Sequence, residues 1–130
     1  MRAIVQRVSE ARAVIDGETV GAIGPGMLVL VCAMPGDGTT TADRLLDKLL
    51  KLRIFQNAAG KLDHSLSDMD GEGRVGGLLL VSQFTLAADL SGGNRPSFKA
   101  AAPPTEAQAL FTHLVTQARA RHANVASGRF

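Results

Sequence analysis

The longest uninterrupted apolar stretch of this chain is Met27-Leu-Val-Leu-Val-Cys-Ala-Met34. Its length and composition are typical of a strand in the middle of a sheet, covered on both faces. The eight residues are too few to cross a membrane, because a membrane span takes about 20. The stretch therefore predicts the centre of a packed core and argues against a membrane protein.

The sequence before this stretch predicts further β structure. Residues 3–15 alternate imperfectly between apolar and polar side chains, and Asp16-Gly17 follows them. This dipeptide supplies the positive φ angles of a tight hairpin turn, so residues 18–23 are expected to return antiparallel. Residues 24–26, Gly-Pro-Gly, then turn the chain into the apolar stretch.

The sequence after this stretch predicts two helices and more strands. Residues 39–55 carry a leucine stripe, with a Thr or Asp near the start as the cap. Residues 61–67 are expected to form a short strand and residues 78–81, Leu-Leu-Leu-Val, a buried one. A long loop leads to a last helix over residues 105–121, capped by its first threonine, Thr105. Together these elements predict an α+β fold.

Composition predicts one soluble domain. The chain has 130 residues, 45% of them hydrophobic, and a net charge of +2, which is small for a protein that coats a duplex but permits a local basic patch. A single cysteine, Cys32, excludes an intrachain disulfide and a thiolate metal cluster. Charges at the N-terminus are unlike a signal peptide, so a cytoplasmic location is expected.

The familiar catalytic and metal-binding patterns are absent from the sequence. The histidines His64, His113 and His122 lack the spacing of a zinc site, and the glycines form neither a P-loop nor a dinucleotide fingerprint. Cys32 lies among apolar neighbours in the expected strand, which predicts an inert buried thiol.

Two polar segments remain as the candidate site. Ser82-Gln83-Phe84-Thr85 follows the second buried strand, and Asn94-Arg95-Pro96-Ser97-Phe98 lies in the long loop. In an extended chain, Ser82 and Phe84 would share one face and Gln83 and Thr85 the other. Polar residues at a strand end beside a long loop are typical of a pocket rim. The alternative is that Ser and Thr cap a sheet edge while Gln bonds the backbone.

The chemistry of the first segment favours binding over base catalysis. Hydrogen-bond donors are plentiful there, whereas the nearest carboxylate in the sequence is Asp89 and no histidine is close. Such a site suits holding a carbonyl group and stabilising its oxyanion, with the nucleophile supplied elsewhere. A serine or threonine nucleophile would need a base brought in from a distant part of the chain.

These segments also carry a resemblance that spans essentially the whole chain. The sequence resembles the D-aminoacyl-tRNA deacylases, formerly called D-tyrosyl-tRNA deacylases. The four-residue strings Ser82-Gln83-Phe84-Thr85 and Arg95-Pro96-Ser97-Phe98, at their observed separation, are highly specific for this family. Either string alone would be a weak signal. The matching segments are Met1–Val8, Leu52-Arg53-Ile54-Phe55, Gly60-Lys61, Ser65-Leu66, Val81–Leu86, Arg95-Pro96-Ser97-Phe98 and Gly128-Arg129-Phe130.

The resemblance implies an activity and a site. Family members hydrolyse the ester that joins a D-amino acid, or glycine mischarged on tRNA(Ala), to the 3′ end of tRNA, as proofreading in translation. It implies a barrel-like, antiparallel or mixed sheet with two main helices, a homodimer with the site at the interface, and no metal or cofactor. The implied catalytic residues are Ser82, Gln83, Phe84 and Thr85, with either Thr85 as the nucleophile or catalysis assisted by the ribose 2′-hydroxyl of the substrate.

The implied substrate-binding residues lie in the loop and at both ends of the chain. They are Arg7, Arg95, Pro96, Ser97, Phe98 and Phe130. Arg7 and Arg95 are candidates for contacts with tRNA phosphates, and the alternative is an ordinary surface or ion-pair role. The alternative to a hydrolase is a non-catalytic dimeric module that binds RNA ends or amino acids.

One departure from the family pattern concerns the C-terminus. Family members continue past the Gly-Arg-Phe segment into a strand with an Asn-x-Gly-Pro-x-Thr motif, whose Gly-cis-Pro dipeptide excludes L-amino acids. This chain ends at Phe130, and none of its prolines fits that motif. Residues 1–130 are therefore expected to be a single deacylase-like domain, truncated relative to the family and impaired in stability, activity or chiral selectivity.

Overall fold

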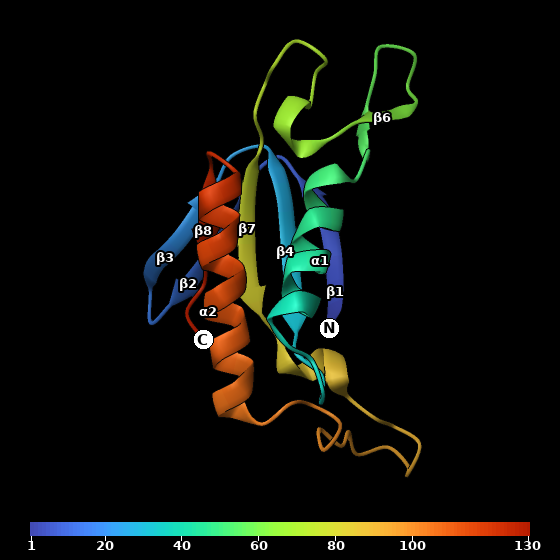
Figure 1. Cartoon of the computed structure of the whole chain (residues 1–130), viewed down its shortest axis with the longest axis vertical. Coiled ribbons are helices and arrows are strands. Elements are labelled where there is room, and N and C mark those ends of the chain that lie inside the picture. The colour runs from blue at the N-terminus through green and yellow to red at the C-terminus, as the bar shows by residue number, and fades with distance from the viewer.

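A four-stranded mixed sheet forms the centre of the computed structural model, which describes all of residues 1–130 (Figure 1). The strands lie in the order β1-β4-β7-β8. β1 runs antiparallel to β4, whereas β4 and β7 are parallel to each other, as are β7 and β8. The predicted central position of the long apolar stretch is confirmed, because β4 lies between β1 and β7. The bounds are β1 (Arg2–Val8), β4 (Gly26–Cys32), β7 (Gly77–Ser82) and β8 (Val125–Ser127).

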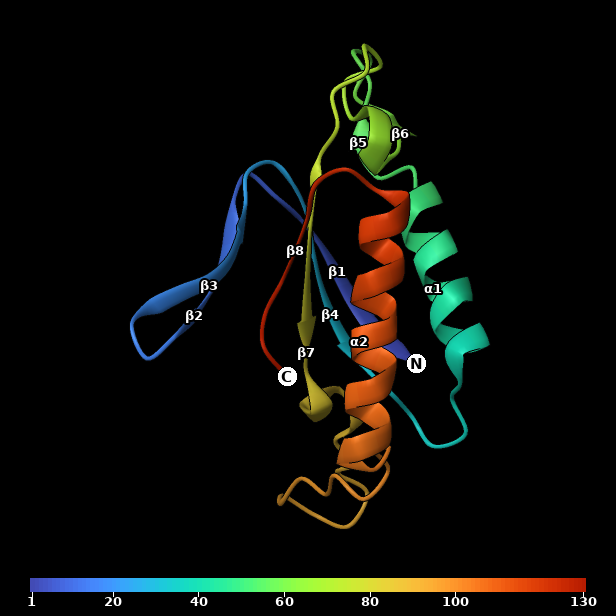
Figure 2. The ribbon, with the colours of Figure 1, turned by 60° about the vertical axis from the view of Figure 1, so that its left-hand side comes forward.

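Two helices, α1 (Thr39–Lys51) and α2 (Pro104–Arg121), cover one face of this sheet (Figure 2). Alternate residues of β4 point toward them, and Met27, Val29 and Val31 are fully buried or nearly so. Each such side chain contributes about 1.5–3 kcal/mol by leaving water. The prediction that β4 is covered on both faces is therefore wrong for one face: its helix side is buried, whereas Leu28 and Leu30 on the other side remain partly exposed. No helix is both long and apolar enough to span a membrane.

The hairpin of β2 (Ala11–Ile15) and β3 (Glu18–Ile23) lies on the side of the sheet away from the helices (Figure 2). Its predicted turn is confirmed, since Asp16 and Gly17 adopt φ angles of 51° and 79°. β3 packs against β7 and β8. A side chain at Gly21 would overlap the backbone carbonyl of Ser127, so glycine permits this close approach. The predicted α+β class is therefore confirmed, with a mixed sheet and two main helices.

The first helix is shorter than predicted. It ends at Lys51 instead of residue 55, and Phe55 belongs to β5 (Phe55–Gln56), which pairs with β6 (Leu62–His64). The strand expected over residues 61–67 covers only β6 and is followed by the 3₁₀ turn η1 (Leu66–Asp68). The side chain of Arg53 binds the Asp63 carboxylate. This contact joins the two sides of the hairpin, and the sequence pattern of one helix could not reveal it.

The predicted contribution of a threonine to the start of α1 is confirmed, whereas the predicted cap of α2 is wrong. α1 begins after Gly38, whose N–H donates to the side-chain oxygen of Thr41 at 3.2 Å. Thr41 thus serves the helix start from its third position, as in one half of a capping box. α2 begins after Pro103, with Pro104 as its first residue in place of Thr105. Proline fits there because its fixed φ is helical and its missing N–H would have no partner.

Candidate active site

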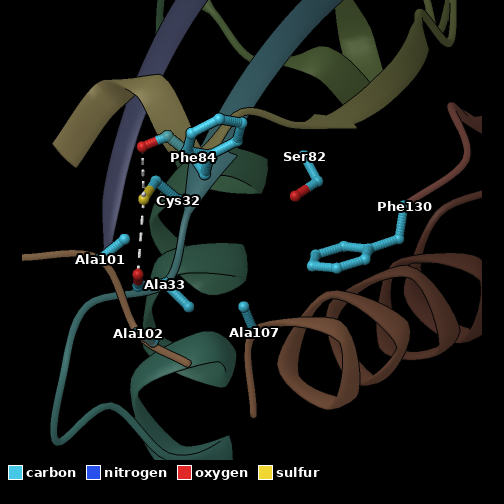
Figure 3. Close-up of a pocket in the computed structure, with 8 residues that line it drawn as sticks. All are labelled: Cys32, Ala33, Ser82, Phe84, Ala101, Ala102, Ala107 and Phe130. Carbon is cyan, nitrogen blue, oxygen red and sulfur yellow. Dashed lines mark hydrogen bonds between the residues drawn. The ribbon is translucent and has the colours of Figure 1, made fainter. Parts of the chain in front are cut away.

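A cavity of about 140 Å³ lies where β4 and β7 end (Figure 3). Because these two strands are parallel, their carboxyl ends meet at the same edge of the sheet, and Val31 is the register partner of Ser82. The long loop and the start of α2 close the other side. The cavity is lined by Cys32, Ala33, Ser82, Phe84, Ala101, Ala102, Ala107 and Phe130.

The segment after β7 turns sharply instead of remaining extended. The strand ends at Ser82, and Phe84–Ala87 form the 3₁₀ turn η2, in which the Leu86 N–H donates to the Gln83 carbonyl at 3.3 Å. The predicted strand-like alternation of these residues is therefore wrong beyond Ser82. Ser82 and Phe84 both line the cavity, whereas Thr85 is exposed and does not.

The long loop meets this turn, as predicted from the two polar segments. Ser97 and Asp89 exchange both backbone hydrogen bonds, at 2.8 and 2.9 Å. The next residue, Phe98, places its ring edge-on against Phe84, with centroids 5.0 Å apart and planes at 74°. An adjoining cleft of about 410 Å³ is lined by both rings, by Phe130 and by Lys99. The two segments and the last residue of the chain therefore surround one apolar space.

Four of the six predicted substrate-binding residues do not line this space in the single chain. Arg7 lies at the opposite end of β1, where its guanidinium donates to the Ile54 carbonyl at 3.1 Å. Arg95 and Pro96 are exposed on the loop and line neither cavity. Ser97 contributes through the backbone bonds that shape the loop. Of the six predicted residues, Phe98 and Phe130 line the apolar space directly.

The lining of the cavity offers no general base. It includes no carboxylate or imidazole, and the nearby Asp89 carboxylate accepts the Ser91 N–H at 2.9 Å, which lowers the pKa of Asp89. Burial raises the pKa of the Cys32 thiol, which therefore stays protonated at neutral pH. As the first residues of the turn, Phe84 and Thr85 have no partner inside it for their N–H groups. The arrangement can hold an acyl group and donate hydrogen bonds to its oxygen.

Several lining residues were missed in the sequence. Cys32 was expected in mid-strand, but it is the last residue of β4, and its Sγ lies 3.4 Å from the Ala33 carbonyl and 3.7 Å from the Phe84 carbonyl (Figure 3). The sequence signal for Cys32 as a lining residue was its position just before the loop that begins at Pro35. Ala102 and Ala107 had no such sequence signal, because small apolar residues are common throughout a core. No three His, Cys, Asp or Glu side chains lie together as a metal site would require.

Comparisons with known proteins found relatives of this chain in both sequence and fold. The D-aminoacyl-tRNA deacylase of Albidiferax ferrireducens is 60% identical over 130 residues, which are 100% of this chain and 82% of that protein. A solved structure named c-Myc DNA Unwinding Element Binding Protein has 32% identity and a TM-score of 0.88, over 100% of this chain and 85% of that one. A structure described as a "probable eukaryotic D-amino acid tRNA deacylase" has a TM-score of 0.71 at 18% identity, over 98% of this chain and 87% of that one.

The family assignment follows from the extent of these matches. The family model described as D-Tyr-tRNA(Tyr) deacylase matches residues 4–130. That range includes every strand except the first residues of β1, both helices and all residues that line the cavity. The chain belongs to the D-Tyr-tRNA(Tyr) deacylase family of enzymes.

Proposed function

We propose that this chain hydrolyses the ester bond of D-aminoacyl-tRNA and thereby removes D-amino acids from tRNA during translation. Water adds to the acyl carbon, the bond to the ribose 3′ oxygen breaks, and a free D-amino acid and tRNA leave. The observation that carries the proposal is the base-free cavity at the carboxyl ends of β4 and β7. Its small apolar lining fits an aminoacyl group, and the names of the relatives support this substrate class. We extend the proposal to glycine mischarged on tRNA(Ala).

The missing base supports a mechanism in which a hydroxyl group of the substrate activates the attacking water. A serine or threonine hydroxyl is a weak nucleophile without an adjacent base. Thr85 is exposed, does not line the cavity and has no hydrogen bond from its side chain to a carboxylate or an imidazole. The 2′-hydroxyl of the terminal ribose is adjacent to the ester in every aminoacyl-tRNA. We therefore assign activation of the attacking water to this hydroxyl.

The protein contributes shape and hydrogen bonds. The N–H groups of Phe84 and Thr85 at the start of η2 are the proposed donors to the carbonyl oxygen, which becomes negative as water adds. The half-exposed side chain of Gln83 is proposed to orient the substrate, and the hydroxyl of Ser82 lies in the cavity wall. Removing one such donor from an oxyanion site lowers kcat by about 10²–10³ in known enzymes.

The substrate and the assembly are part of the proposal. Lys99 at the adjoining cleft and Arg95 on the same loop supply positive charge for the phosphates at the 3′ end of tRNA. The face of β1 and β4 away from the helices exposes Ile4, 46% accessible, beside Leu28 and Leu30. This apolar surface supports a homodimer. A tRNA substrate implies a cytoplasmic enzyme.

Deacylation of matched D- and L-charged tRNA tests the proposal. We expect release of the D-amino acid, a strong loss of rate when the terminal 2′-hydroxyl is replaced by hydrogen, and a rate within about threefold of wild type for Thr85→Val. A loss of several powers of ten in Thr85→Val would instead identify a threonine nucleophile. Binding of D-aminoacyl-tRNA without release of the amino acid would favour the alternative, a non-catalytic module that binds RNA ends or amino acids.

A further inference from the structure

The carbonyl groups of the turn η2 are contacted by two side chains from the sheet, those of Arg2 and Cys32. The guanidinium Nη1 of Arg2 donates to the Leu86 carbonyl at 2.9 Å, although the two residues are 84 positions apart in the sequence. The thiol of Cys32 lies 3.7 Å from the Phe84 carbonyl (Figure 3). Both contacts end on carbonyl oxygens of the same short turn.

The sheet register explains why these two side chains act together. Arg2 and Cys32 are direct partners across the antiparallel pair of β1 and β4, and side chains of such partners lie on the same face of a sheet. They reach carbonyls two residues apart on η2. A third bond, from the Gln83 N–H to the Val31 carbonyl at 2.7 Å, attaches the start of the turn to β4.

We propose that Arg2 is a positioning residue that clamps η2, so that the N–H groups of Phe84 and Thr85 are aimed at the bound carbonyl. This inference rests on the proposed function. A four-residue 3₁₀ turn has poor internal hydrogen-bond geometry, and contacts from outside decide its position. The thiol is a weak donor and can also donate to the Ala33 carbonyl. The guanidinium is therefore the stronger part of the clamp.

A comparison of three variants tests this role. Arg2→Met keeps an unbranched side chain but removes the donor, whereas Arg2→Lys retains a donor that can reach a carbonyl. Arg12→Met is the matched control, because Arg12 is another exposed arginine, on β2, whose side chain has no hydrogen-bond partner in the structure. We expect Arg2→Met to lower kcat roughly tenfold, because small displacements of a site cost one to two powers of ten in rate. KM should stay within about twofold, Arg2→Lys should recover most of the rate, and Arg12→Met should match wild type.

Hydrogen exchange of the turn separates this inference from the proposed function. The amides of Leu86 and Ala88 donate inside and just after the turn, so they should exchange faster in Arg2→Met than in wild type and Arg12→Met. Equal exchange, or a kcat of Arg2→Met within twofold of wild type, would overturn the clamp. A wild-type chain that releases no D-amino acid would refute the proposed function alone, because the exchange rates would still decide whether Arg2 holds the turn.

Discussion

Filling the cavity with the side chain of a single residue should block the proposed reaction. Ala107 lies in the first turns of α2 and lines both the cavity and the adjoining cleft. Ala107→Leu adds three carbon atoms that point into this space. Leucine forms helices nearly as well as alanine, and Ala107 is only partly buried, so the helix itself should tolerate the change.

The size of the effect follows from the volume of the cavity. If each added carbon occupies about the volume of a water molecule, ~30 Å³, the leucine takes ~90 Å³ of the 140 Å³ present. A substrate side chain that fills the cavity in wild type then overlaps with the new atoms. We expect kcat/KM for a bulky D-amino acid, such as D-phenylalanine on its tRNA, to fall at least about tenfold, which corresponds to ~1.4 kcal/mol. The D-alanyl substrate should lose less, because its side chain is a single methyl group.

The control for this experiment is Ala109→Leu, two residues further along the same helix. Ala109 is exposed and lines neither space, so this variant should match wild type in rate and in thermal midpoint. Steady-state deacylation of both charged tRNAs by the three proteins gives the comparison. If Ala107→Leu remained folded and hydrolysed the bulky substrate within twofold of wild type, the cavity would not be the acyl site.

Two predictions concern the stability of the fold. A side chain in Gly26→Ala would overlap the backbone of the parallel strand β7, whereas one in Gly24→Ala meets nothing within 4 Å, so thermal denaturation should show a folding defect in the first variant only. Hydrogen bonds from Lys51 and Arg121, at 3.0 Å each, lower the pKa of Asp47 and tie α1 to α2. The stabilisation is present above the unfolded pKa of about 4 and is lost as the pH falls through the lower folded value. The thermal midpoint of Asp47→Asn should therefore lie below that of wild type at pH 7 and converge with it as the pH falls below the folded pKa of Asp47.

Local sequence signals were sufficient for the elements that a few neighbouring residues determine. The Asp16-Gly17 hairpin and the two buried strands around Val29 and Leu80 follow from turn chemistry and apolar runs, and all three were predicted. The end of α1 was not predicted correctly. The leucine pattern favours a longer helix, whereas the bond between Arg53 and Asp63 favours a hairpin. The start of α2 was misplaced for a local reason, because Pro104 itself suits the first position of a helix.

The candidate site was predictable to the extent that its residues are adjacent in sequence. Ser82 and Phe84 were found because polar residues directly follow a buried strand, and Phe98 because it ends a distinctive loop segment. Cys32 and Ala107 join them only through the parallel pairing of β4 with β7 and the packing of α2, which bring together residues up to 75 positions apart. No local sequence pattern predicts the pairing of β4 with β7. The single chain also leaves Arg7 away from the cavity.

The pH dependence of the reaction follows from the groups that are absent from the cavity wall. No residue that lines the cavity carries a carboxyl or imidazole group, and burial raises the pKa of the Cys32 thiol. The buried His122 lies at the far end of β7, where its Nε2–H donates to the Gly76 carbonyl at 2.7 Å. No group of the protein in the cavity wall should therefore change charge between about pH 5.5 and 8.

A conventional nucleophile with a histidine base would give a bell-shaped profile or a step near pH 6.5. Single-turnover rates at saturating enzyme should show no such inflection. A step near pH 6.5 that disappeared in a histidine variant would contradict a mechanism in which the substrate hydroxyl replaces the enzymatic base.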